Sequence, residues 1–219
     1  MDDPSPTTTP LDFERLPPDE MRRRAEGFLG RIRTRRSVRH FSEEALPLDV
    51  VERCIEAAAQ APSGANKQPW TFVLVTDVEV KRRIREAAEK EEQAFYGGRA
   101  SERWLEDLAP LGVGPDKPFL DVAPALVVVF AQRQGQDADQ HYYVSESVGI
   151  AVGFLLAALH EAGIATLTHT PSPMKFLGEI LERPANERAY MLIPIGFPVT
   201  GCDVPDIGRK SLDEVLVRK

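Results

Sequence analysis

Four groups of side chains in this chain have the types and spacing to do chemistry, and the first is a run of arginines. Residues 31–41 carry five arginines, although the formal net charge of the chain is −7. Arg35, Arg36 and Arg39 offer planar guanidinium groups that suit phosphate oxygens, and Ser37 adds a hydroxyl donor. A monoester phosphate carries about −1.5 to −2 charges, which two or three arginines would balance. The same pattern is also typical of a solvated helix end.

The overall charge of the chain argues against a polyanion as the partner of these arginines. With a pI near 5.2, the molecule as a whole should be repelled by nucleic acid. No basic segment with interleaved aromatic residues follows the run, although a surface for single-stranded nucleic acid needs one. A small anion is therefore the better candidate, and nucleic acid is not expected as a partner.

The second group is the turn sequence Pro62-Ser63-Gly64-Ala65-Asn66, which follows an apolar helical pattern. Proline, glycine and asparagine end helices and form turns, so a structural role alone is a sufficient explanation. A functional role is also open. Gly64 has no side chain, and it would let backbone N–H groups approach a flat ligand.

The third group is Glu92, Tyr96 and Lys117. Glu92 and Tyr96 are four residues apart in a helical segment, so they share one face, and Lys117 follows in a loop. Exposed helix faces rich in glutamate and lysine are common, so an ordinary charged surface is one interpretation. The charge types also suit a zwitterionic amino acid, with a carboxylate for the ammonium group and a lysine and a phenol for the carboxylate.

The fourth group is Thr168-His169-Thr170, which follows the apolar residues 164–167. A single histidine at the end of a strand is more often structural than catalytic, so the pattern alone assigns no chemistry to His169. Cys54 and Cys202 lie in unrelated contexts, and no cluster of histidines accompanies them. We therefore expect two reduced thiols, no disulfide and no metal site.

Apolar periodicity and turn residues place these groups on helices and short strands. A first helix opens at Pro17-Pro18-Asp19 and ends among the arginines. Further helices are expected at residues 48–60, 79–96, 101–108, 142–162 and 174–181, and strands at 71–75, 125–130, 164–167 and 190–195. Two leading helices and few strands favour an α+β sandwich over a doubly wound sheet. No Gly-x-Gly-x-x-Gly motif follows a strand, so a Rossmann dinucleotide site has no support.

The length of 219 residues fits one compact domain or two small ones, and the composition is that of a folded soluble protein. The Pro-rich residues 1–18 predict a flexible arm without a signal sequence, and residues 19–219 form the predicted domain. The longest uncharged apolar stretch, residues 148–159, is shorter than the roughly 20 residues that cross a bilayer. This stretch predicts a buried core helix. A cytoplasmic location without membrane contact is the expectation.

Several short motifs together resemble those of the FMN-dependent nitroreductase superfamily. They are Arg35-Arg36-Ser37-Val38-Arg39, Ala61-Pro62-Ser63-Gly64-Ala65, Gln68-Pro69-Trp70, Ala123-Pro124-Ala125 and Gly196-Phe197-Pro198. Their order and spacing resemble the family from about residue 30 to the C-terminus. Glu92, Tyr96 and Lys117 narrow the resemblance to the iodotyrosine deiodinase branch, where such a trio binds the amino-acid end of the substrate. General nitroreductases lack it.

The resemblance implies an FMN site. Arg209, within residues 204–210, would join Arg35, Arg36 and Arg39 at the phosphate, and the Thr170 hydroxyl would bond flavin N5 and favour one-electron chemistry. The family usually has a threonine where His169 stands. The full set of implied FMN-binding residues is Arg35, Arg36, Ser37, Val38, Arg39, Pro62, Ser63, Gly64, Thr168, His169, Thr170 and Arg209.

The resemblance also implies a fold, an assembly and a reaction. The fold would be an α/β sandwich with a central mixed sheet flanked by helices, in an intertwined homodimer that joins the arginine loop of one subunit to the Pro62–Gly64 turn of the other. The partner subunit would partly bury the apolar helix at 148–159. Reductive dehalogenation of a halotyrosine would give tyrosine and halide, with the substrate phenolate held by the Ala65 backbone N–H and the amino-acid end covered by the trio.

Two other function classes remain open from the sequence. One is a general NAD(P)H-dependent reductase of nitroaromatic compounds or quinones, and the other is a flavin-binding or amino-acid-binding module without catalysis. The electron donor is open as well. NADPH could act directly, or a separate reductase or a ferredoxin could supply the electrons.

Overall fold

The computed structural model describes residues 7–135 and 139–219, and it divides into two units, Met1–Thr34 and Arg35–Lys219. Residues 1–6 of the predicted arm lie outside the described residues. In the first unit, residues 7–17 carry no regular secondary structure, and helix α1 follows at Pro18–Thr34. Acidic residues in its first turn and basic residues in its last turn suit the helix dipole. None of its residues is buried.

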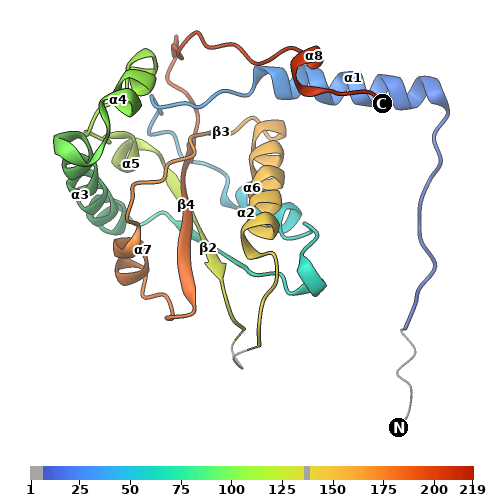
Figure 1. Cartoon of the computed structure of the whole chain (residues 1–219), viewed down its shortest axis with the longest axis horizontal. Helices are drawn as coiled ribbons and strands as arrows, with labels where there is room; N and C mark the ends of the chain where they lie inside the picture. Colours follow the sequence, from blue (N-terminus) through green and yellow to red (C-terminus); the bar gives the residue numbers. More distant parts are fainter. Residues whose placement is uncertain (1–6, 136–138) are drawn as a thin grey trace. The chain divides into compact units, whose positions relative to one another are not determined.

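The second unit contains a four-stranded sheet in the order β1-β2-β4-β3 (Figure 1). Its strands are β1 (Trp70–Val75), β2 (Ala125–Gln132), β3 (Ala165–Thr166) and β4 (Glu187–Gly196). The first six residues of β2 are all buried, because helices cover both faces of the sheet. All pairings between the four strands are antiparallel.

The parallel component of the predicted mixed sheet is small. Among the described residues it consists of one isolated bridge, between Ser37 and Thr166. The Val38 backbone N–H donates to the Thr166 carbonyl at 3.0 Å, and Val38 is buried. This short pairing fixes residues 35–39 of the arginine run at the β3 edge of the sheet.

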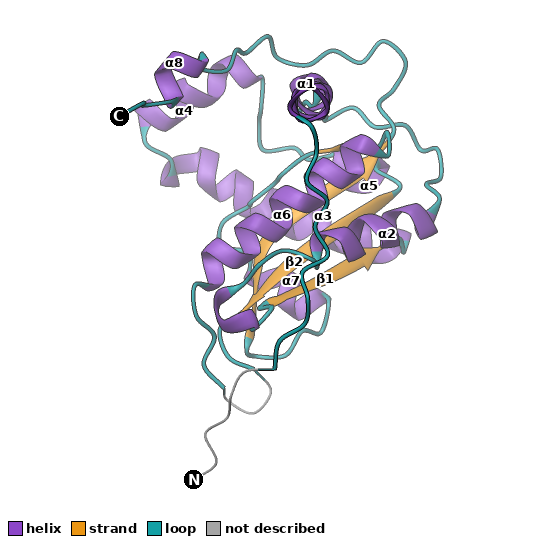
Figure 2. Ribbon diagram, turned by 90° about the vertical axis from the view of Figure 1, so that its right-hand side faces the viewer, coloured by secondary structure: helices purple, strands orange, loops and turns teal. Residues whose placement is uncertain are grey.

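Helices pack on both faces of the sheet and bury two apolar clusters. The helices of this unit are α2 (Leu48–Ala58), α3 (Val78–Ala94), α4 (Glu102–Leu108), α5 (Phe119–Val122), α6 (Val144–Glu161), α7 (Lys175–Ile180) and α8 (Leu212–Val215). Val127 and Val129 of β2 face the cluster under α2 and α6, whereas Val128 and Phe130 face the cluster under α3, α5 and α7. The side-chain period of two along a strand produces this division. Seen from the side of α2 and α6, the strands lie behind these two helices (Figure 2).

Short helical turns extend the longer helices and connect the elements. They are Gly64–Asn66, Phe95–Arg99 and Ala109–Leu111. The predicted break at Gly97-Gly98 falls in the second of these, a π-helical turn that continues α3 and ends where Gly98 adopts a φ of 147°. The six predicted helices are observed with boundaries that differ by a few residues, whereas the short helices α5 and α8 were not predicted.

The predicted core helix, α6, is buried on one face only. Its buried residues are Ser147, Val148, Ala151, Val152, Leu155 and Leu159, at the spacing of a helical stripe. On other faces, Ile150 and Phe154 are 41% and 45% exposed. Of the described helices, α6 alone is long and apolar enough to cross a bilayer. The core helices of soluble proteins can have the same length and composition, so this finding alone is weak evidence for a membrane span. Its apolar exposed side chains are the kind of surface that another protein chain covers.

Candidate functional site

A cavity of about 440 Å³ lies between the C-terminal end of α3, the loop before α5 and the segment that follows β3. Its volume falls in the range of small-molecule sites. The predicted site residues among its lining are Arg39, Glu92, Tyr96, Lys117, Thr168, His169 and Thr170. The fold therefore brings the predicted amino-acid trio and the Thr-His-Thr sequence to one cavity.

Glu92 and Lys117 form an ion pair inside this cavity. The Lys117 Nζ atom lies 3.0 Å from Glu92 Oε2, and the two side chains are 7% and 13% exposed. Lys117 Nζ also donates to the Gly114 carbonyl and lies 5.7 Å from the centroid of the Tyr96 ring. In the absence of a ligand, the two buried charges satisfy each other. A zwitterionic amino acid carries a partner for each of them.

Tyr96 is a hydrogen-bond donor at this wall. Burial raises the pKa of Tyr96, the Glu92 carboxylate raises it further, and the Arg39 guanidinium acts in the opposite direction. The phenol therefore keeps its proton at neutral pH. Phe95 packs edge-on against Tyr96 and against Trp104, with ring centroids 5.3 and 4.9 Å apart. Phe95 and Trp104 belong to none of the predicted site groups; two aromatic residues in an otherwise charged segment are the signal that the sequence offers for them.

His169 closes the inner side of the cavity as a neutral imidazole. Its backbone pairs with Leu192 of β4 through hydrogen bonds of 2.9 and 3.0 Å, and its side chain is 11% exposed. Burial, together with the charges of Lys117 and Arg39, lowers the pKa of His169 to about 3. Its Nε2 atom lies 3.9 Å from Glu92 Oε1 and has no hydrogen-bond partner among the described residues.

Arg35 and Arg36 of the arginine run form a second basic group with Arg209 of the C-terminal segment, residues 204–210. Burial lowers the pKa of Arg35, and the charges of Arg209 and Arg36 lower it further. The Arg36 side chain donates to the Pro205 carbonyl, which ties the two segments together. Within residues 7–135 and 139–219, none of these three arginines pairs with a carboxylate. Guanidinium groups that repel one another without an acidic partner fit an anion, and a phosphate monoester matches their donor geometry.

The predicted arginine set is divided between two places. Arg35 lies near Arg36 and Arg209, whereas Arg39 lines the cavity beside Tyr96 and His169. The bridge at Ser37 and buried Val38 separates them, because it pins the chain to β3. Burial lowers the pKa of Arg39 as well. A bound anion or an electron-rich group would therefore stabilise the charged guanidinium groups at both places.

The Pro62–Ala65 turn lies away from the cavity. It precedes β1, and β1 and β3 are opposite edges of the sheet. The Gly64 N–H donates to Ser147 Oγ at 3.3 Å, and a Cβ atom on Gly64 would lie 2.7 Å from the Tyr142 carbonyl oxygen. The backbone before α6 therefore occupies the space that a side chain at position 64 would need. Pro62, Ser63 and Ala65 are absent from the described lining of the cavity.

The turn nevertheless has an unusual backbone. Ala65 and Asn66 have φ values of 49° and 53°, in the left-handed region that costs L-residues roughly 1–2 kcal/mol each. Strain of this kind gathers at functional sites, where the surrounding structure maintains it. Ala65 is exposed, so its backbone is accessible to a ligand or to another chain.

Comparisons with known proteins agree with this architecture. The family model described as "Nitroreductase family" matches residues 32–197. Iodotyrosine deiodinase of Haliscomenobacter hydrossis is 50% identical over 216 residues, which cover 97% of each chain. Iodotyrosine deiodinase 1 of Mus musculus is 44% identical over 215 residues, covering 95% of this chain and 75% of the mouse protein.

Solved structures give the same result. A crystal structure of oxidized iodotyrosine deiodinase bound to FMN and 3-iodo-L-tyrosine has a TM-score of 0.78 and 32% identity, and the match covers 87% of this chain and 97% of the other. A nitroreductase with bound FMN from Bacteroides fragilis, at 20% identity and a TM-score of 0.65 over 87% and 98% of the two chains, shares the fold. The predicted resemblance and the predicted fold class are confirmed, and the chain belongs to the iodotyrosine deiodinase branch of the nitroreductase family.

Proposed function

We propose that the chain catalyses the FMN-dependent reductive dehalogenation of a halogenated tyrosine, giving tyrosine and halide. One observation carries the proposal: Glu92, Tyr96 and Lys117 converge on one wall of a cavity, with opposite charges that a zwitterion can take over. The relatives named iodotyrosine deiodinase support it at 44% and 50% identity. The related crystal structure with FMN and 3-iodo-L-tyrosine supports the same cofactor and substrate class.

The charged groups of the substrate's amino-acid end take over the partners in the ion pair between Glu92 and Lys117. Its ammonium group binds Glu92, and its carboxylate binds Lys117 and the protonated Tyr96 hydroxyl. Both charges are nearly buried, so a ligand that satisfied only one of them would leave the other without a partner. The site therefore selects molecules that carry an ammonium group and a carboxylate together.

Arg35, Arg36 and Arg209 would hold FMN through its phosphate, and the Thr170 hydroxyl would be available to flavin N5. When bound, FMN would supply the electrons that cleave the carbon–halogen bond. Overall, a carbon–halogen bond is replaced by a carbon–hydrogen bond, two electrons and one proton are consumed, and halide leaves. Phe95, Tyr96 and Trp104 wall the cavity, and they exclude water once the amino-acid end is bound.

A homodimer completes the site. The Pro62–Ala65 turn lies at the opposite edge of the sheet from the arginine run, so a second copy would supply the turn, including the Ala65 N–H that binds the substrate phenolate. The half-exposed apolar side chains of α6, Ile150 and Phe154, suit such an interface. Electrons reach the flavin from NADPH, directly or through a separate reductase.

An anaerobic single-turnover experiment tests the proposal. The purified protein is loaded with FMN, reduced chemically and mixed with 3-iodo-L-tyrosine, while flavin absorbance and iodide release are followed. We expect reoxidation of the flavin with one iodide released per flavin. Binding of iodotyrosine without iodide release would indicate a binding module, and rapid nitroaromatic reduction by NADPH without dehalogenation would indicate a general reductase; either result would refute the proposal.

A further inference from the structure

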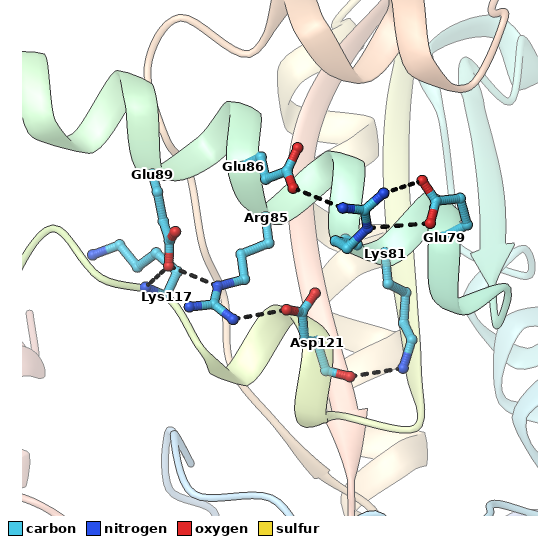
Figure 3. Close-up of polar contacts among 8 residues, drawn as sticks. Glu79, Lys81, Arg85, Glu86, Glu89, Lys117 and Asp121 are labelled. Atoms are coloured by element: carbon cyan, nitrogen blue, oxygen red, sulfur yellow. Dashed lines mark hydrogen bonds and ion pairs between the residues drawn. The ribbon is translucent and has the colours of Figure 1, made fainter.

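Helix α3 holds the segment that carries Lys117 through side chains on successive turns. Lys81, Arg85 and Glu89 are four residues apart, so they project from one face of α3. Figure 3 shows this face turned toward Lys117 and toward Asp121 of α5. The next turn of the helix carries Glu92, the partner of the Lys117 ammonium group. One face of α3 therefore contacts both the main chain and the side chain of this segment.

Glu89 binds the main chain of Lys117. Its Oε1 atom accepts the backbone N–H of Lys117 at 2.7 Å and the Nε–H of Arg85 at 2.8 Å (Figure 3). Only 18% of the Glu89 side chain is exposed, so water competes weakly for the carboxylate. Glu89 is absent from the described lining of the cavity. Any effect that it has on a ligand is therefore indirect, and its hydrogen bond to the Lys117 N–H links it directly to a residue of the lining.

Arg85 and Lys81 extend the same attachment along α5. Arg85 Nη1 donates to Asp121 Oδ2 at 2.7 Å, and the hydrogen bonds to Glu89 and Asp121 raise the pKa of Arg85. Lys81, which is 5% exposed, donates to the carbonyls of Asp121 and Ala123 at 2.9 and 2.7 Å. The segment from Lys117 to Ala123 is thus fixed to α3 at several points.

A neighbouring, solvent-exposed part of the α3 surface offers a matched comparison. Arg82 pairs with Glu79 and with Glu86, but these three side chains are 54%, 62% and 63% exposed. Exposed pairs of this kind contribute little. Glu86 and Glu89 are therefore the same residue type on the same helix, one in a solvated pair and the other bound to the loop that carries Lys117.

We propose that Glu89 is a positioning residue for the recognition of the amino-acid end: by holding the Lys117 backbone N–H, it keeps the Lys117 ammonium group within reach of the ligand carboxylate. The inference rests on the proposed function. Without Glu89, residues 114–117 gain freedom, and the ligand must order them when it binds. The loss should fall on ligands with an amino-acid end and spare ligands that have only the halogenated ring.

The test compares E89A, the conservative variant E89Q and the control E86A in the full chain loaded with oxidised FMN. Binding of 3-iodo-L-tyrosine and of 2-iodophenol is measured by flavin fluorescence. We expect E89A to raise the Kd of iodotyrosine about tenfold, the effect of one lost charge-assisted hydrogen bond, and to change that of 2-iodophenol less than twofold. E89Q retains an oxygen for the Lys117 N–H, so its loss should be smaller, and E86A should match the wild type.

Hydrogen exchange of the ligand-free protein gives a readout independent of the flavin. The Lys117 amide should exchange faster in E89A and at the wild-type rate in E86A. Equal weakening of both ligands, or E89A binding iodotyrosine like E86A, would overturn the inference. If E89A does not fold, E89Q carries the same comparison between the two ligands. Failure of the wild type to bind iodotyrosine would instead refute the proposed function.

Discussion

Replacing Lys117 with methionine would remove one half of the buried ion pair while keeping most of the side-chain volume. The Glu92 carboxylate, 13% exposed, would then lose the cation that lies 3.0 Å away. Its other close polar neighbour, His169 Nε2, is 3.9 Å away and carries no charge at neutral pH, because the pKa of His169 is about 3. The carboxylate would be left with little compensation.

The expected cost follows from this geometry. Removing one partner of a buried pair costs about 3–5 kcal/mol, and water in the cavity places this site at the lower end of that range. We expect K117M to lower the free energy of unfolding by about 3 kcal/mol. E92Q should cost a similar amount, because it leaves the ammonium group of Lys117 buried. The double variant leaves neither charge, so its loss should be about 2 kcal/mol smaller than the sum of the single losses.

Urea unfolding of the ligand-free protein measures all four members of this cycle. A coupling energy near 2 kcal/mol between positions 92 and 117 would establish that the two charges stabilise each other before any ligand binds. Losses that add to within about 0.5 kcal/mol would refute the reasoning, because they would mean that water already solvates each charge separately. The same variants should also bind 3-iodo-L-tyrosine more weakly while they retain FMN.

Three further predictions concern other parts of the chain. Gly64→Ala should lower the free energy of unfolding by about 1–3 kcal/mol, since the added Cβ would lie 2.7 Å from the Tyr142 oxygen; urea titration checks this. Arg209→Ala should weaken FMN binding about tenfold or more without destabilising the ligand-free protein, because it relieves repulsion of Arg35; FMN titration and thermal unfolding separate the two effects. The pKa of His169 is about 3 in the folded protein and about 6.5 in the unfolded protein. Between these two pH values, the unfolded state binds a proton at His169 that the folded state does not bind. Stability should therefore fall as the pH drops from about 6.5 toward 3, and the fall should be shallower in His169→Asn.

Local sequence patterns were sufficient to predict the strands and the longer helices, but not the short helices α5 and α8 or the contacts between elements. The four-residue spacing of Glu92 and Tyr96 placed both on one helix face, and the Thr-His-Thr sequence fell at a strand end, as observed. The contact of Arg85 with Asp121 could not be predicted, because it depends on how the chain reverses between residues 97 and 117. The internal Arg85 and Glu89 pair was visible as a helical spacing, yet nothing in that spacing distinguishes it from the exposed pair of Arg82 and Glu86.

The arginine run shows a second limit of sequence reasoning. Arg35, Arg36 and Arg39 lie close in sequence, and their shared residue type suggests a single ligand. The backbone bridge at Ser37 divides them instead, because pairing with Thr166 fixes the chain between them. Long-range strand pairing of this kind is set by tertiary packing. Without it, the separate place of Arg39 beside Tyr96 could not be foreseen.

Under the proposed function, the internal pairing of Glu92 and Lys117 would give the site its selectivity. A cavity lined by one buried charge would have to be stabilised elsewhere in the fold, whereas opposite charges compensate each other until a ligand arrives. Separating Glu92 from Lys117 costs free energy. A ligand with only an ammonium group or only a carboxylate offsets part of this cost, because it pairs with one of the two side chains. A zwitterion recovers both parts at once, provided that the Lys117 main chain stays where Glu89 holds it. Selectivity for an amino acid would therefore depend on the rigidity of the α3 and α5 attachment as much as on the two charges themselves.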